Sequence, residues 1–228
     1  MRSFIVTGVN RGLGKAIREC LSVDDFDLDQ KVFLSRYLLN EKDSCARRES
    51  DLAYDFSEGS LDFSAIKINS EVRQIVFISN AGVIEPIGAA TDIDTVQIAS
   101  ALQVNCLSPL KLAQHLANHS KVAGIPLLII DVSSGAASRP VKGWLSYCVS
   151  KAAAKMAFDV MASENPLVTV VHFDPGVMDT KMQEIIRGQS ESSMPDVEVF
   201  REFKADDRLK SPADVAHEVL RIIIENLS

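Results

Sequence analysis

The feature that most constrains the fold of this chain is a series of six short apolar runs separated by segments long enough to form helices. Most of the runs are continuous hydrophobic stretches, such as FIVT, IVFIS and LLIIDV, without regular alternation of apolar and polar residues. Continuous runs of this length are typical of strands that are buried on both faces of a parallel sheet. The expected strands are 3–7, 32–35, 52–55, 74–79, 127–132 and 168–173.

The segments between these runs have helical periodicity, and Ser211 followed by Pro212 marks the start of one more helix. The expected helices are 12–22, 60–70, 95–119 and 147–163. This alternation predicts a single α/β domain over residues 1–228, a doubly wound parallel sheet of the Rossmann type with six main strands. Residues 179–210 are polar and lack a clear period, which predicts a lid over a bound ligand.

Composition and charge exclude several classes of protein. A formal net charge of -7 and the lack of any Lys and Arg cluster argue against nucleic acid as a partner. No stretch reaches about 18 uninterrupted apolar residues, and the N-terminus lacks the apolar core of a signal peptide. We therefore expect a cytoplasmic protein with no membrane contact. The four cysteines lie far apart, so no metal site is expected.

A glycine-rich turn, TGVNRGLG, spans residues 7–14 and follows the first expected strand. Glycines allow a tight turn and let backbone N–H groups approach a pyrophosphate at the positive end of a helix. The alternative is a turn that only packs a helix closely on a strand. The candidate dinucleotide contacts in this turn are Gly8, Asn10, Arg11, Gly12, Leu13 and Gly14.

The end of the second expected strand bears on the choice of nucleotide. An acidic residue at this point would bind a ribose 2′-hydroxyl, but the chain has Leu34, Ser35 and Arg36 there. Its absence favours a 2′-phosphate and therefore NADP(H), which Arg11 and Arg36 would hold through charge-assisted hydrogen bonds. The alternative is that both arginines are solvated surface residues.

Further motifs follow the fourth, fifth and sixth expected strands, at the edge where an open α/β sheet binds its ligands. They are SNAG at 79–82, SSG at 133–135, YCVSK at 147–151 and DPGVMDT at 174–180. In this order the motifs resemble the short-chain dehydrogenase/reductase family, and the resemblance covers nearly all of the chain. It implies a Rossmann fold, a nicotinamide cofactor and chemistry at a carbonyl group.

Two of these residues carry the expected proton transfer. Tyr147 and Lys151 are four residues apart, so they share one face of a helix. A tyrosine hydroxyl exchanges a proton near neutral pH when a cation stabilises its phenolate, and Lys151 supplies that cation and reaches the cofactor ribose. By resemblance, Ser134 orients the substrate carbonyl, with Ser133 as the alternative. Asn105 would hold a water in the proton relay, or else occupy a kink beside a proline.

The resemblance also assigns the rest of the cofactor site. Asp55, after the third expected strand, would meet the adenine amine or else cap the segment that follows. Asn80, Ala81 and Gly82 would lie under the ribose on the adenine side. The residues that would hold the nicotinamide end are Pro175, Gly176, Val177 and Thr180.

Within the family, residues 142–148, 151–153 and 175–183 are most similar to sepiapterin reductase and benzil reductase. Sepiapterin reductases continue into a seventh strand and a terminal acidic residue that anchors the pterin, whereas this chain stops at Asn226-Leu227-Ser228. We therefore expect the seventh strand to be missing or truncated, and a pteridine is disfavoured. An apolar wall would instead suit an aromatic ketone or vicinal diketone, unless its residues are ordinary packing. Its members are Val83, Ile84, Trp144, Met178 and Met182.

The sequence thus predicts an NADPH-dependent carbonyl reductase. Two alternatives stay open. A 3-oxoacyl thioester reductase would need a basic patch for an acidic carrier protein, and none is obvious. A regulatory protein that senses NADP without turnover would not need Tyr147 and Lys151.

The family resemblance also predicts a homodimer, formed through the helices 95–119 and 147–163. The expected interface residues are Ala101, Leu112, Leu116, Ala153, Ala157 and Val160.

Overall fold

The computed structural model describes residues 1–23, 26, 28–38 and 48–226, so Leu227 and Ser228 lie outside the described residues. A parallel sheet forms its centre, in the strand order β3-β2-β1-β4-β5-β6. The order reverses between β1 and β4, which is the topology of a doubly wound sheet. The strands are β1 (Arg2–Thr7), β2 (Gln30–Ser35), β3 (Glu49–Ala53), β4 (Gln74–Ser79), β5 (Leu127–Val132) and β6 (Val168–Phe173).

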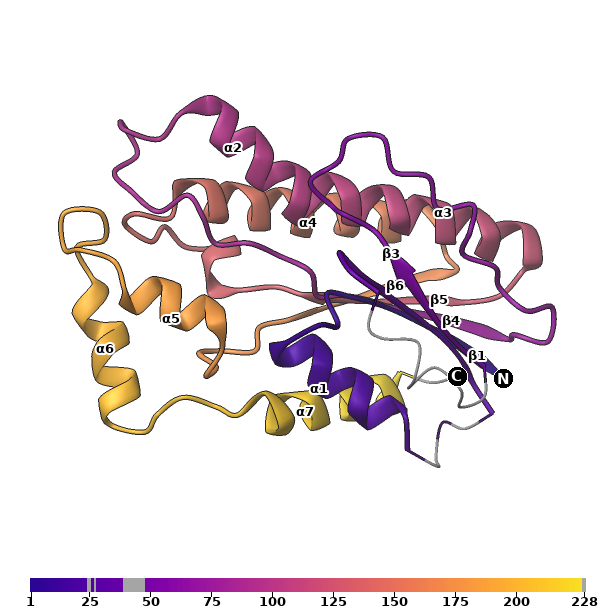
Figure 1. Ribbon diagram of the computed structural model, residues 1–228. Helices are drawn as coiled ribbons and strands as arrows, with labels where there is room; N and C mark the ends of the chain where they lie inside the picture. The colour runs from indigo at the N-terminus through magenta and orange to yellow at the C-terminus, as the bar shows by residue number, and fades with distance from the viewer. Residues whose placement is uncertain (24–25, 27, 39–47, 227–228) are drawn as a thin grey trace.

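Helices cover both faces of the sheet (Figure 1). On one face lie α1 (Gly12–Leu21) and α7 (Pro212–Glu225). On the other lie α2 (Thr95–Leu102), α3 (Ser108–Ala123) and α4 (Leu145–Glu164). The predicted single α/β domain with a doubly wound sheet is confirmed. The described residues contain six strands of this sheet and no seventh.

Successive residues of a strand point to opposite faces of the sheet and pack into two separate apolar cores. On β1, Ile5 packs toward the α3 and α4 side, whereas Phe4 and Val6 pack toward α1 and α7. All three side chains are fully buried. Burial on both faces explains the continuous hydrophobic runs of the inner strands β1, β4 and β5.

The predicted helix 60–70 is wrong, because this segment forms a series of turns. Asp62 accepts hydrogen bonds from the backbone N–H and the hydroxyl of Ser64, and Asn69 accepts one from the N–H of Glu71. Such short polar side chains offer the backbone an alternative to helical hydrogen bonds. The apolar residues of the segment still reach the core, among them Phe63. The third strand also differs: it ends at Ala53, before the turn that begins at Asp55.

The predicted helix 95–119 is interrupted. A π-helical turn, Gln103–Leu107, separates α2 from α3, and Ser108 donates its N–H to the carbonyl of Gln103. Pro109 lies in the first turn of α3 and has no N–H for the carbonyl of Asn105 four residues earlier. The loss of this donor explains why the regular helix breaks at Asn105.

The segment 179–210, where a lid was predicted, contains two helices, α5 (Lys181–Arg187) and α6 (Val197–Ala205). Its base is closed by backbone hydrogen bonds, since Lys210 donates to Val177 and accepts from Asp179. Its centre packs on the protein, with Met194 fully buried. The sequence of this segment has no clear helical period, and burial of its apolar side chains against α4 is what orders it.

The prediction that Ala101, Leu112 and Leu116 lie in a dimer interface is wrong, because all three are buried in the core of this chain. Ala153 and Ala157 are half-buried on α4, and Val160 is exposed. Among the described residues, no helix is both long enough and apolar enough to cross a bilayer.

Candidate active site

The glycine-rich turn is held to β4 by Asn80. The Asn80 Nδ2 donates to the carbonyls of Thr7 (2.9 Å) and Gly8 (3.2 Å). In return, the Thr7 hydroxyl accepts from the N–H groups of Asn80 and Ala81, each at 3.0 Å. This mutual bonding fixes the loop between β1 and α1, so Asn80 acts by shaping the loop as well as by its place near the expected ribose.

The glycines of this loop have no side chains, and their absence leaves space beside the loop for a ligand. Gly8 and Gly12 have positive φ angles of 73° and 55°. A Cβ on Gly14 would lie 2.2 Å from the carbonyl oxygen of Gly8, so only glycine fits there. α1 begins after Arg11 with no side-chain cap and no acidic residue in its first turn. A helix start of this kind leaves N–H groups to bind an anion, and these residues fit a dinucleotide pyrophosphate.

The loop after β6 meets the glycine turn. A Cβ on Gly12 would lie 3.4 Å from the Thr180 methyl group, so the two segments face each other across the end of the sheet. Gly176 has a φ of 71° and donates its N–H to Asp174. The carbonyl of Val177 already accepts the Lys210 N–H. The expected nicotinamide contacts are therefore brought next to the glycine turn, and Pro175 lies within the same loop.

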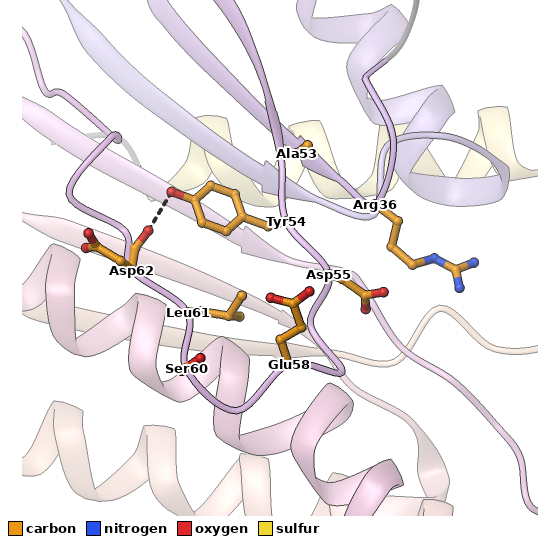
Figure 2. Close-up of a pocket in the computed structure, with 8 residues that line it drawn as sticks. All are labelled: Arg36, Ala53, Tyr54, Asp55, Glu58, Ser60, Leu61 and Asp62. Atoms are coloured by element: carbon orange, nitrogen blue, oxygen red, sulfur yellow. Dashed lines mark hydrogen bonds between the residues drawn. The ribbon is translucent and has the colours of Figure 1, made fainter.

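The residues expected at the adenine end line a pocket of about 330 Å³ at the ends of β2 and β3 (Figure 2). Arg36 and Asp55 both line it, as do the carboxylate residues Glu58 and Asp62. The Asp55 carboxylate accepts the N–H and the hydroxyl of Ser57, and these hydrogen bonds, helped by the charge of Arg36, lower its pKa. Asp55 thus caps a turn and is ionised beside Arg36.

The expected catalytic residues gather at the ends of β5 and α4. Ser134 follows β5, and its hydroxyl accepts the N–H of Ala136 at 3.2 Å. Tyr147 and Lys151 are both buried in the first turns of α4. The Lys151 Nζ lies 5.9 Å from the centre of the Tyr147 ring and donates to the carbonyl of Val132 at 2.7 Å. The cation is therefore close enough to act on the phenol electrostatically.

Asn105 joins three parts of the site. Its Nδ2 donates to the carbonyl of Val83 (2.8 Å) and to the hydroxyl of Ser150 (2.9 Å), while its Oδ1 accepts the Val83 N–H at 2.8 Å. Ser150 in turn donates to the carbonyl of Tyr147. The side-chain N–H groups of Asn105 are thus used within the protein. Its main-chain carbonyl, which Pro109 cannot serve, is the atom that fits the expected water contact.

An apolar cluster that includes residues of the segment 179–210 contacts Tyr147, the expected proton donor. Trp144 and Tyr147 pack edge to face with ring centres 5.6 Å apart, and Ile84, Met182 and Met194 belong to the same cluster. The structure does not bring all expected wall residues together. Met178 packs on the core beneath α1 and α7, and Val83 contributes backbone contacts to Asn105.

A charged network missed by sequence reasoning links β5, β6 and α4. The His172 Nδ1 lies 2.9 Å from a carboxylate oxygen of Asp131, and its Nε2 lies 2.8 Å from Asp159. Both nitrogens thus face carboxylates, which raises the pKa of His172 despite its burial. Lys155 also donates to Asp159 at 2.7 Å. The i,i+4 spacing of Lys155 and Asp159 was a sequence signal for a helix pair, but nothing in the sequence pointed to His172.

The family model for short chain dehydrogenases matches residues 2–191. The fold and the site therefore define the class: the chain belongs to the short-chain dehydrogenase family, whose members are oxidoreductases that use a nicotinamide cofactor at a CH–OH or C=O group.

Several known proteins are similar to this chain. Benzil reductase ((S)-benzoin forming) of Bacillus subtilis is 29% identical over 98% of this chain and 93% of its own length. Sepiapterin reductase of Bos taurus is 32% identical over 52% of this chain and 46% of its own. The crystal structure of the KRED1-Pglu enzyme matches 100% of this chain and 97% of its own, with a TM-score of 0.81 and 24% identity.

Proposed function

We propose that this protein is an NADPH-dependent carbonyl reductase that acts on ketones or vicinal diketones. The observation that carries the proposal is the grouping of Ser134, Tyr147 and Lys151 where β5 ends and α4 begins, next to a glycine-rich nucleotide loop. Benzil is the substrate that the name of the Bacillus subtilis relative gives, and that relative aligns with nearly all of this chain.

The chain's own residues supply binding and proton transfer. The bound nucleotide would supply the hydride. Ser134 holds the carbonyl oxygen, and Tyr147 gives that oxygen its proton. Lys151 favours the tyrosinate and binds the ribose hydroxyls. The Asn105 side chain joins the loop at Val83 to the start of α4 through its hydrogen bonds to Val83 and Ser150. Its main-chain carbonyl holds the water through which Lys151 regains a proton.

Two features support NADPH over NADH. The chain has Arg36 where an acidic residue would bind the 2′-hydroxyl, and Arg11 lies exposed just before α1. Both guanidinium groups suit a phosphate dianion. The carboxylates of Asp55 and Glu58 line the same pocket, so Arg36 is the residue on which the selection depends.

The apolar cluster under the lid supports a substrate with an aromatic body. Trp144 and Met182 would contact such a body while its carbonyl lies at Tyr147. A vicinal diketone with aryl groups fits this combination of an apolar wall and polar catalytic groups.

The test is the loss of NADPH absorbance with a panel of benzil, simple aryl ketones and 3-oxoacyl thioesters. We expect kcat/KM to be highest for the diketone. Preference for the thioesters would favour the acyl-reductase alternative, and tight NADPH binding without turnover of any compound would favour a cofactor-sensing protein. Either result would overturn the proposal.

A further inference from the structure

Beside the proposed substrate serine lies an arginine, Arg139, that forms no ion pair with any residue that the structure describes. Arg139 is exposed and follows the short turn Gly135–Ala137, which begins directly after Ser134. A Cβ on Gly135 would lie 3.0 Å from Nε and 3.2 Å from Nη2 of Arg139. The guanidinium thus rests against the α-carbon of Gly135. Since consecutive α-carbons are about 3.8 Å apart, it is a near neighbour of Ser134.

Nearly all the other cations of this region are paired with a carboxylate. From residue 139 to residue 210, all of which the structure describes, every Lys and Arg except Arg139 and Lys151 forms an ion pair with a carboxylate. The pairs are Lys142–Asp196, Lys155–Asp159, Lys181–Glu184, Arg187–Asp179, Arg201–Glu198, Lys204–Asp179, Arg208–Asp206 and Lys210–Glu218. Lys151 already has a role at Tyr147. Arg139 is the second cation in this stretch with no carboxylate partner among the described residues.

The shape and charge of a guanidinium group favour a carboxylate as its ligand. Its planar fork of N–H donors matches the two oxygens of a carboxylate. Because Gly135 has no side chain, the fork can lie directly against its backbone, one residue from Ser134. The main chain of Arg139 also lies near α4, because its carbonyl is 3.9 Å from the Cys148 sulfur, next to Tyr147.

We propose that Arg139 binds a carboxylate attached to the carbonyl that is reduced, so that 2-oxo acids with an aromatic or large apolar side chain are a substrate class of this enzyme. The inference rests on the proposed carbonyl reductase function. The reduced nicotinamide would supply the hydride for the new C–H bond at C2 as the C=O π bond breaks, and Tyr147 would give a proton to the oxygen. The products are a 2-hydroxy acid and the oxidised nucleotide.

The experiment compares phenylglyoxylate with its methyl ester, which keeps the two carbonyl groups but removes the charge. We expect Arg139→Gln to lower kcat/KM for the acid by about 10- to 100-fold, the range of lost charged hydrogen bonds, with a change of less than about threefold for the ester. Arg139→Lys keeps the charge but loses the fork, so its effect on the acid should be intermediate. Lys142→Gln is the matched control, because Lys142 is exposed nearby but already pairs with Asp196.

A binding measurement separates this inference from the proposed function. Phenylglyoxylate is titrated calorimetrically into the wild-type protein and into Arg139→Gln, each with oxidised NADP, so no reduction takes place. Weaker binding to the variant supports the carboxylate site even if no carbonyl compound is reduced. Equal binding to both proteins, no binding to the wild type, or a parallel loss of acid and ester activity would overturn it.

Discussion

The ammonium of Lys151 donates a 2.7 Å hydrogen bond to the main-chain carbonyl of Val132. This contact joins the start of α4 to the end of β5, where Ser133 and Ser134 follow. Lys151 is only 6% exposed, and a buried cation is costly unless it has a polar partner. The bond therefore holds the charge at a defined place beside Tyr147, where it can act on the phenol.

Removal of the Tyr147 hydroxyl should separate catalysis from binding. Tyr147→Phe keeps the ring that packs on Trp144, so the Kd for NADPH should change little. The lost proton donor should lower kcat by about 10²- to 10⁴-fold. Lys151→Ala should weaken NADPH binding and also lower kcat, because the same ammonium binds the ribose and stabilises the tyrosinate. Fluorescence titration and steady-state kinetics measure the two effects, and near-normal turnover of Tyr147→Phe would show that the mechanism is wrong.

Arg36 should decide the choice of nucleotide. Arg36→Ser removes the cation from a pocket that Asp55 and Glu58 also line, so kcat/KM with NADPH should fall by about tenfold or more. The value with NADH should hardly change. Arg221→Ser, an exposed arginine on α7, is the control. Equal efficiency of NADH and NADPH in the unchanged protein would contradict the assignment.

His172 should make stability depend on pH. Its raised pKa means that its contribution is complete below the unfolded value of about 6.5 and is lost as pH rises through the folded value. The pKa of Asp159 is lowered, chiefly by the hydrogen bond from Lys155 and then by that from His172, so its contribution requires a pH above about 4.

The pH dependence can be measured by urea unfolding. His172→Gln should lower the free energy of unfolding by about 1–3 kcal/mol near pH 6 and by less near pH 9. His217→Gln, an exposed histidine on α7, should cost little at either pH. If the difference in free energy of unfolding between the wild type and His172→Gln increased toward high pH, the predicted pH dependence would be wrong.

The exposed side of α4 should form a homodimer interface. Val149, Met156 and Val160 are 41%, 64% and 45% exposed, and with Ala153 they follow the i, i+4, i+7, i+11 spacing of one helix face. Met156→Glu should convert a dimer into a monomer of 24.9 kDa in light scattering at micromolar concentration. Val122→Glu changes an exposed apolar residue on α3 and should leave the dimer intact. A monomeric wild type would remove the argument.

Local patterns in the sequence determined most of the fold and the proposed catalytic residues. Strands β4, β5 and β6 have the predicted bounds. In β4 and β5 every residue is buried, which is what their continuous apolar runs predict. The spacing of Tyr147 and Lys151 placed both residues on one helix face, since helical periodicity depends on the local chain alone.

Tertiary structure decided what depends on distant contacts. Residues 60–70 have a helical pattern, but side-chain hydrogen bonds such as Asp62 to Ser64 and packing of Phe63 in the core favour turns. The position of Arg139 beside Gly135, and that of His172 between Asp131 and Asp159, depend on which charges the folded chain brings together. The sequence alone determined which groups exist and on which local faces they lie, while only packing decided which of the described charges found ionic partners.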